Sequence, residues 1–332
     1  MIRGLTIAVG VLAAGYGGYW FVAANAAGKG AEALVERLRA DGLVVDYSDL
    51  ATRGFPSRID TTVTDLAVSD PESGLGWQAP WFQVFALSYR PNQIIAAWPE
   101  EQTVILPGEV LTVTSEGMKA SAHVGLSSDL PLAQATVEAA PIAVSAAEAG
   151  WTAGAAHVIA AFRKAEAGEA DYDLFAELDS LTLPAPVVAL IDPEGSLPPA
   201  VDIARLDATV TFDQPIDAAG GQPVLQAVTI REARITWGGI AVSVTGQLAT
   251  GESGRAEGEL VADITDWSGL MDLAIAAGAL SQEQAPLWRN AMSMAAAGDP
   301  DLSAPLHLRN GLVFLGPVPI GVAPVLPGAA AE

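Results

Sequence analysis

The chain has 332 residues, of which 51% are apolar and only 17% are charged. This much apolar material can form a core, which excludes global disorder. The 39 acidic and 16 basic residues give a formal charge of −23, which argues against a nucleic-acid partner because phosphate binding needs a basic surface. The absence of cysteine excludes disulfides, thiol chemistry and iron–sulfur clusters.

Residues 1–27 are expected to form a transmembrane anchor or a signal segment. Residues 5–24 carry no charge, and twenty helical residues at about 1.5 Å each span about 30 Å, the hydrocarbon thickness of a bilayer. Arg3 precedes this stretch, and three aromatic residues lie towards its far end: Tyr16, Tyr19 and Trp20. This pattern predicts a single pass through the inner membrane, with a cytoplasmic N-terminus and a periplasmic bulk.

Two other interpretations of this segment stay open. Ala24-Asn25-Ala26 fits a signal-peptidase site, and cleavage would leave a soluble periplasmic protein. The long apolar run and the bulky residues before the site favour an uncleaved signal-anchor. Small residues at Gly10, Ala14 and Gly18 have the spacing that packs against a second membrane helix, which would suit a structural partner of a membrane protein.

Beyond this segment the apolar period is first helical and then alternating. Residues 31–41 predict a short helix, separated from the first segment by a loosened joint at Gly28 and Gly30. The following strands are expected at residues 58–68, 77–89, 103–106, 109–114 and 119–126.

The second half repeats this alternation around three expected helices. Trp151, Ala155, Val158 and Phe162 recur at helical spacing and predict a helix. Strands are expected at residues 172–178, 206–212, 240–248, 256–264, 305–309 and 312–315, with helices from Trp267 to Gly278 and from Ser281 to Gly298. Strands with one polar face are typical of antiparallel sheets.

The expected fold class is therefore mainly β (α+β), with extended, curved antiparallel sheets and a few packing helices behind one N-terminal transmembrane helix. Residues 28–326 are expected to form one β-rich periplasmic domain, with two lobes divided near residue 170. Residues 327–332 are expected to be a flexible tail.

No catalytic, cofactor-binding or metal-binding set emerges, so we do not expect an enzyme. His123, His157 and His307 are isolated from one another in the sequence, and none forms the spaced pair that holds zinc. The acids of one strand face are the alternative enzyme site, one for envelope polysaccharide: Asp171, Asp173, Glu177 and Asp179.

Aromatic residues gather in the strand at residues 77–89. Trp77, Trp81, Phe85 and Tyr89 share one phase of alternation, while Phe82 lies on the other. A strand face of this kind is expected to be core or, if left uncovered, the lining of an apolar ligand groove.

Arg53 to Asp60 and the ending Leu312–Pro319 resemble a bacterial family known as domain of unknown function 2125. Its candidate turn motif here is Gly54, Phe55, Pro56 and Arg58, and the spacing to Asp70-Pro71 is similar too. The resemblance implies an envelope protein of uncharacterised activity. The ribbon at residues 237–265, with Gly246, Gly251 and Gly258, also resembles AsmA-like envelope proteins, which are associated with outer-membrane lipid handling.

These expectations converge on a membrane-anchored envelope protein that binds or scaffolds, with a lipid or other apolar ligand as the more specific hypothesis. The sequence leaves open the identity of the ligand, the protein partners, the oligomeric state and the cleavage of the N-terminal segment.

Overall fold

The computed structural model describes residues 2–127, 129–193, 195–217, 221–316 and 318–326, so the expected tail at 327–332 lies outside the described residues. Its contacts form two compact units, with no division near residue 170. Unit 1 comprises Met1–Val124 and Ala143–Gly150, and unit 2 comprises Gly125–Ile142 and Trp151–Glu332. The fold is mainly β, as the sequence predicts, and the strand pairs in both units are antiparallel.

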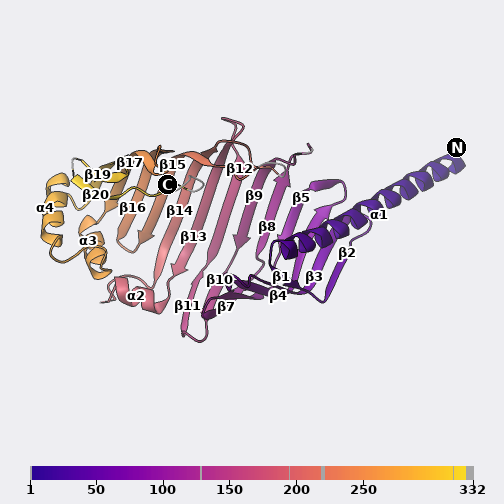
Figure 1. The fold of residues 1–332 in the computed structure, drawn as a ribbon, viewed down its shortest axis with the longest axis horizontal. Helices are drawn as coiled ribbons and strands as arrows, with labels where there is room; N and C mark the ends of the chain where they lie inside the picture. Colours follow the sequence, from indigo (N-terminus) through magenta and orange to yellow (C-terminus); the bar gives the residue numbers. More distant parts are fainter. Residues whose placement is uncertain (1, 128, 194, 218–220, 317, 327–332) are drawn as a thin grey trace. The chain divides into compact units, whose positions relative to one another are not determined.

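Unit 1 consists of one long helix and a sheet of short and medium strands (Figure 1). The helix is α1 (Ile2–Ala40), and the strands are β1 (Val44–Asp46), β2 (Asp49–Arg53), β3 (Arg58–Ser69), β4 (Gly76–Leu87), β5 (Arg90–Ala97), β6 (Glu101–Leu106), β7 (Glu109–Ser115), β8 (Lys119–Val124) and β10 (Ile142–Ala146). β3 pairs with β1, β2 and β4. At one end β4 pairs with β5, which pairs with β8, and at its other end β4 pairs with β6, which pairs with β7.

Helix α1 is continuous, so the predicted break at Gly28 and Gly30 is wrong. Neither glycine has a positive φ, and the second half of the helix packs on the sheet, which compensates for their low helix propensity. Among the helices whose side chains the structure describes, none is both long and apolar enough to cross a membrane. The side chains of residues 5–10, which belong to the predicted span, lie outside that description.

The predicted phase of the aromatic strand is also wrong. Trp77 and Phe82 were placed on opposite faces, yet their rings meet edge to face with centroids 5.7 Å apart. Between them, Pro80 lies opposite Asp65, which has a left-handed φ of 50°. Proline cannot donate to the sheet and a left-handed residue breaks the pleat, so alternation restarts after this pair.

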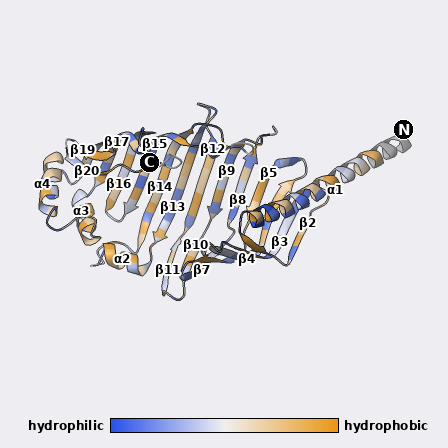
Figure 2. Ribbon diagram, in the orientation of Figure 1, coloured by the Kyte–Doolittle hydropathy of each residue, from blue (hydrophilic) through white to orange (hydrophobic). Residues whose placement is uncertain are grey.

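Unit 2 is built on an antiparallel meander (Figure 1). Its strands in spatial order are β9 (Leu132–Ala139), β12 (His157–Lys164), β13 (Asp171–Thr182), β14 (Ala200–Phe212), β15 (Leu225–Trp237), β16 (Ile240–Thr250), β17 (Ala256–Thr265), β18 (Leu302–Arg309), β19 (Leu312–Leu315) and β20 (Val318–Val322), with β11 (Trp151–Ala155) at the end of β13. Hydrophobic and hydrophilic residues alternate along these strands (Figure 2).

The helix predicted from Trp151 to Phe162 is wrong, because strands β11 and β12 occupy this segment. Val158, Ala160 and Phe162 also alternate at a period of two, and they pair with β9 on one side and β13 on the other. The two periods coincide over this short stretch, and strand pairing on both edges decides between them.

Three helices complete unit 2: α2 (Ala185–Ile191), α3 (Trp267–Ala276) and α4 (Ala285–Ala295). The last two were predicted from their apolar stripes. The side chain of Asp266 caps α3 by accepting a hydrogen bond from the backbone N–H of Gly269, and Pro286 stands in the first turn of α4, where its missing N–H costs nothing.

Two glycines allow β16 and β17 to approach each other closely. Gly246 has a φ of 139° and Gly258 a φ of 149°. A Cβ atom would lie 2.3 Å from the carbonyl oxygen of Glu259 at the first position and 2.1 Å from that of Gln247 at the second. Only glycine fits both the conformation and the space.

We expect Gly258→Ala to lower the free energy of unfolding by about 3 kcal/mol, because it combines a strained backbone with a steric clash. Urea denaturation measures this loss. Gly239→Ala is the matched control, since a Cβ there meets nothing within 4 Å; its effect should stay within about 0.5 kcal/mol. Equal effects of the two changes would contradict the close approach.

Candidate functional site

One face of the unit 2 sheet is apolar over four neighbouring strands. On β13 and β14, Leu174, Ala176 and Leu178 lie opposite Ala208, Leu206 and Ala204. The same face continues through Ala233 and Ile235 of β15 to Val244 and Val242 of β16. A face of this kind must be covered by other parts of the chain or by a partner, because exposed apolar area costs about 25 cal/mol per Å².

The chain covers this face at its two ends. At one end, the buried residues Ala323 and Leu326 of the C-terminal segment join a core cluster with Tyr172, Val210 and Leu225. At the other end, α3 and α4 pack against the sheet around Ile264 and Leu302. Within the described part of the chain, neither of these two clusters extends over the middle of the face.

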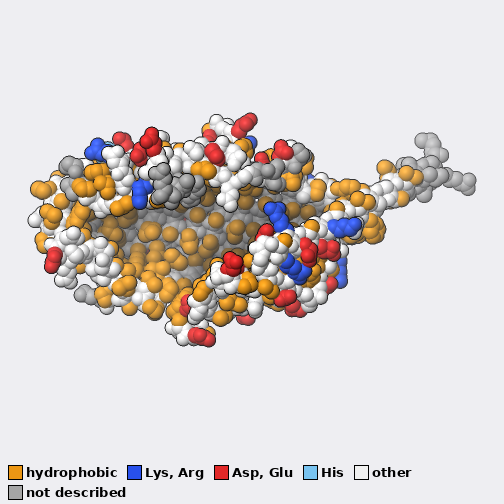
Figure 3. Space-filling view, viewed as in Figure 1, with side chains coloured by type: hydrophobic (Ala, Val, Ile, Leu, Met, Phe, Trp, Pro, Cys, Tyr) orange, Lys and Arg blue, Asp and Glu red, His pale blue; other side chains and the backbone are white. Residues whose placement is uncertain are grey.

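An apolar groove lies in this middle region (Figure 3). Its volume is about 570 Å³, within the range of small-molecule sites. It is lined by Ala176, Leu178, Ala204, Leu206, Ala233, Ile235, Val242 and Val244 of the sheet and by Leu270 of α3, together with Arg205 and Arg234. The two arginines alternate with the apolar positions, and their side chains engage acids.

These acids neutralise both arginines. The Nε of Arg205 lies 2.9 Å from Glu177 Oε2, in an ion pair that is not aligned as a hydrogen bond. The Nε of Arg234 lies 2.8 Å from Glu232 Oε1. The groove therefore presents hydrocarbon surface with no uncompensated charge.

The backbone of the groove offers no hydrogen bonds either. Each of its four strands is paired on both sides at the lining positions, through β12 and β17 at the outer edges. An extended peptide carries a donor and an acceptor at almost every residue, and these would lie unsatisfied against this wall. A hydrocarbon chain has no such groups, so the surface suits it best.

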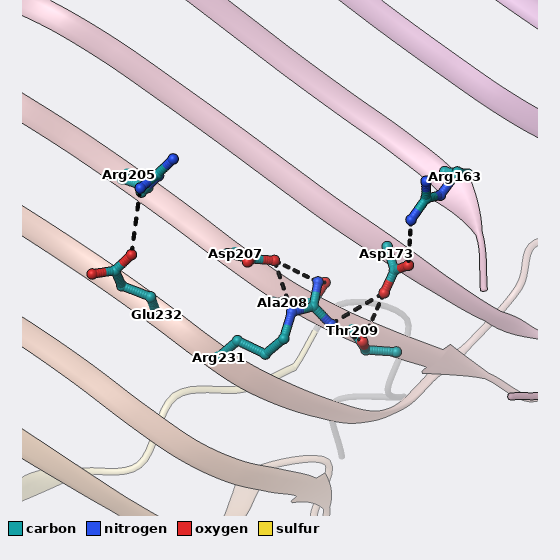
Figure 4. A network of polar contacts seen from close by, with 8 residues as sticks. All are labelled: Arg163, Asp173, Arg205, Asp207, Ala208, Thr209, Arg231 and Glu232. Carbon is teal, nitrogen blue, oxygen red and sulfur yellow. Dashed lines mark hydrogen bonds and ion pairs between the residues drawn. The ribbon is translucent and has the colours of Figure 1, made fainter. Parts of the chain in front are cut away.

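The opposite face of the same sheet is polar and ionic (Figure 4). Asp173 accepts hydrogen bonds from Arg163 (3.1 Å), Thr209 (3.0 Å) and Arg231 (3.1 Å). Partial burial opposes ionisation of Asp173, but these hydrogen bonds and the charge of Arg231 outweigh it and lower its pKa. A hydrogen bond to Asp207 in turn raises the pKa of Arg231, so the Asp173–Arg231 pair favours the charged form of both side chains.

The candidate acids of this face are engaged in these contacts, and Asp173 also lines a cavity of about 490 Å³ with its partners Arg163 and Thr209. Asp171 accepts a hydrogen bond from Thr211, Glu177 pairs with Arg205, and Asp179 lies 3.5 Å from His157. A general acid needs a raised pKa, whereas that of Asp173 is lowered. No group of acids and histidines that could hold a metal ion occurs among the described residues.

The four candidate aromatic residues lie in unit 1 and do not line a common groove. Trp77 packs in the cluster beneath the second half of α1, and Trp81 is half-buried opposite Thr64. The guanidinium carbon of Arg58 lies 5.2 Å from the ring centre of Phe85, while Tyr89 is exposed in the turn after β4. The apolar groove is instead in unit 2.

Helix α1 packs against the turn motif, which consists of Gly54, Phe55, Pro56 and Arg58. Gly54 has a φ of 110°, and a Cβ there would lie 2.8 Å from the carbonyl oxygen of Arg58. That same oxygen accepts a hydrogen bond of 2.6 Å from Trp20 Nε1. The Phe55 ring meets the Trp20 ring edge to face at 5.4 Å. The motif is thus a structural element that holds the helix.

Sequence reasoning missed the groove residues as a site. Their alternation was visible, and it correctly predicted one apolar face. The sequence pattern does not show which part of the apolar face is packed against other segments. Only the folded positions of α3 and of the C-terminal segment show which part of that face stays open.

We expect Asp173→Asn to lower the free energy of unfolding by about 1–2 kcal/mol at pH 7, because it leaves two arginines without their shared acceptor. The pKa of Asp173 is lowered in the folded state, so this stabilisation is present above the unfolded pKa of about 3.9 and is lost as pH falls below it. Denaturation of the unaltered protein and of Asp173→Asn from pH 7 to pH 3 measures this loss. The free energies of unfolding of the two proteins should converge as the pH falls.

The matched control is Asp263→Asn, which removes the same charge from an exposed position of β17. Its effect should stay within about 0.5 kcal/mol at every pH. A pH-independent loss in Asp173→Asn would show that packing, rather than the ionised network, accounts for its effect.

Comparison with known proteins gives a family and no activity. No curated protein and no solved structure matches the chain, so the likeness to AsmA-like proteins is not shown. The pattern of one bacterial family matches residues 20–324, from within α1 to the C-terminal segment that covers the sheet. The chain belongs to this family, domain of unknown function 2125, described as an uncharacterised protein conserved in bacteria.

Proposed function

We propose that this protein is a membrane-anchored component of the bacterial cell envelope that binds a lipid-like ligand by its hydrocarbon chain. The observation that carries the proposal is the open apolar groove of unit 2, lined by Leu270 and by four strands that are paired on both sides at the lining positions. Each methylene group moved from water into such a site contributes about 0.8 kcal/mol. A chain of a dozen carbons therefore supplies ample affinity without a single hydrogen bond.

The chemistry of the groove favours binding over catalysis. Its only titratable side chains are two arginines, and both are engaged by acids. A sugar would leave its hydroxyl groups without partners on this surface, which is costly in an apolar setting. A hydrocarbon chain matches it over its whole length.

Anchoring of the chain is supported by the N-terminal segment. Residues 5–24 are uncharged, and large apolar side chains of α1 stand open to solvent. Val11, Leu12, Phe21 and Val22 are all more than 60% exposed. Such a surface on a helix suits the interior of a bilayer, with Arg3 on the cytoplasmic side and the β units in the periplasm.

Filling the groove tests the proposal. Ala204→Phe and Ala233→Phe each place a phenyl ring among the lining residues, where it excludes part of a bound chain. Loss of two methylene contacts costs about 1.6 kcal/mol, or more than tenfold in affinity. Fluorescence titration with the fatty acid cis-parinaric acid measures this loss on the full chain held in an amphipathic polymer, with the polymer alone as blank.

Ala241→Phe is the matched control, since Ala241 belongs to β16 but alternates with the lining residue Val242 and so points to the polar face. Its affinity for the probe should equal that of the unaltered protein. Circular dichroism and thermal melting verify that all three variants fold. Unchanged binding in both groove variants, with the fold intact, would refute the proposed site.

A further inference from the structure

Exposed aromatic rings gather where α1 meets the unit 1 sheet, some on the helix itself and some on neighbouring turns. We call this group the aromatic collar: Tyr16, Tyr19, Phe21, Phe55 and Tyr89. Their exposed fractions run from 39% for Tyr16 to 66% for Phe21. They come from the helix, from the turn before β3 and from the turn after β4.

Ser88, fully buried, joins these three segments. Its hydroxyl lies 2.7 Å from the hydroxyl of Tyr16, and its carbonyl oxygen accepts a hydrogen bond from Tyr19 at 2.7 Å. Its N–H donates to Ser57 in the neighbouring turn. These hydrogen bonds hold the three segments of the collar together. Within the collar, the Phe21 and Phe55 rings stack with their centroids 6.1 Å apart.

The length of α1 ahead of Tyr16 determines how close the collar lies to a membrane that the helix crosses. The hydrogen bond between Tyr16 and Ser88 ties α1 to unit 1, and residues 5–15 of the uncharged run precede this tie. They give about 16 Å at 1.5 Å per residue, against about 30 Å of hydrocarbon. A helix that crosses the bilayer while keeping these contacts must draw the collar into the lipid surface, with local thinning of the bilayer.

The charge around the collar is compatible with lipid headgroups. The protein as a whole carries −23, yet residues 50–59 and 73–99, which hold both collar turns, contain no acid and contribute Arg53, Arg58 and Arg90. Aromatic rings with flanking arginines are typical of the membrane interface. Asp60, directly after the first of these segments, is paired with Arg58 at 2.9 Å, and the three arginines outnumber it, so these segments carry no net negative charge that would repel anionic lipid.

We infer that the aromatic collar of unit 1 is embedded in the headgroup region of a phospholipid bilayer. The inference rests on the proposed anchoring by α1 and adds that the turn motif at Gly54–Arg58 contacts lipid directly. Phe55 serves this contact with the exposed part of its ring, which also packs edge to face with Trp20.

The absence of cysteine provides a direct test, because any introduced cysteine is a unique labelling site. Tyr89→Cys and Phe55→Cys carry a fluorophore on the collar. Leu75→Cys is the matched control: it is 47% exposed and lies at the other end of the β3–β4 hairpin, whose 12-residue strands place it about 35 Å away. The full chain is reconstituted into vesicles of phosphatidylethanolamine and phosphatidylglycerol containing a nitroxide-labelled lipid.

We expect the nitroxide lipid to quench both collar labels at least threefold more than the Leu75 label, and iodide in the water to show the reverse order. Flotation of the vesicles reports anchoring separately. If the chain floats and the collar labels match the Leu75 label, the collar inference fails while the anchor stands. If the chain does not float, the anchor fails and the collar inference with it, and groove binding in unit 2 is still tested by its own titration.

Discussion

The constraint on which the structure of unit 2 depends is an apolar sheet face larger than the cover that the described residues supply. Alternation along β13 to β16 makes the face apolar over the groove, where each strand is paired on both sides at the lining positions. The C-terminal segment and the α3–α4 pair cover the ends. What stays open between them is hydrocarbon surface without hydrogen-bonding capacity, so only an apolar occupant relieves its contact with water.

The polar face of the same sheet explains how so acidic a chain holds such a sheet together. Acids on neighbouring strands would repel one another, but Arg231 and Arg205 lie between them and bridge three strands. Cross-strand pairs of opposite charge stabilise a sheet, and here they also pair the two arginines at the groove, Arg205 and Arg234, with acids. The two faces thus differ: ion pairs link the strands on one, and the other carries the apolar groove.

Local pattern was sufficient to predict much of this fold. The alternation at residues 172–178, 206–212 and 240–248 predicted three of the four groove strands, and that at 256–264 predicted β17 beside them. The apolar stripe from Trp267 predicted α3, whereas the groove strand β15 was not predicted. It failed where two periods coincide, at Trp151–Phe162, and where Pro80 opposite Asp65 breaks the pleat. The groove itself lay beyond prediction, because cover is a tertiary property: Leu270 and Leu326 reach the face from segments far along the chain.

Native mass spectrometry of the full chain, released gently from membranes, tests the central claim most directly. The account predicts a species heavier than the bare chain by the mass of one lipid, whose fragments include an acyl chain, and the loss of that species when Ala204 is changed to phenylalanine. The bare chain mass alone under conditions that preserve other lipid complexes, or an adduct that persists unchanged in Ala204→Phe, would contradict it.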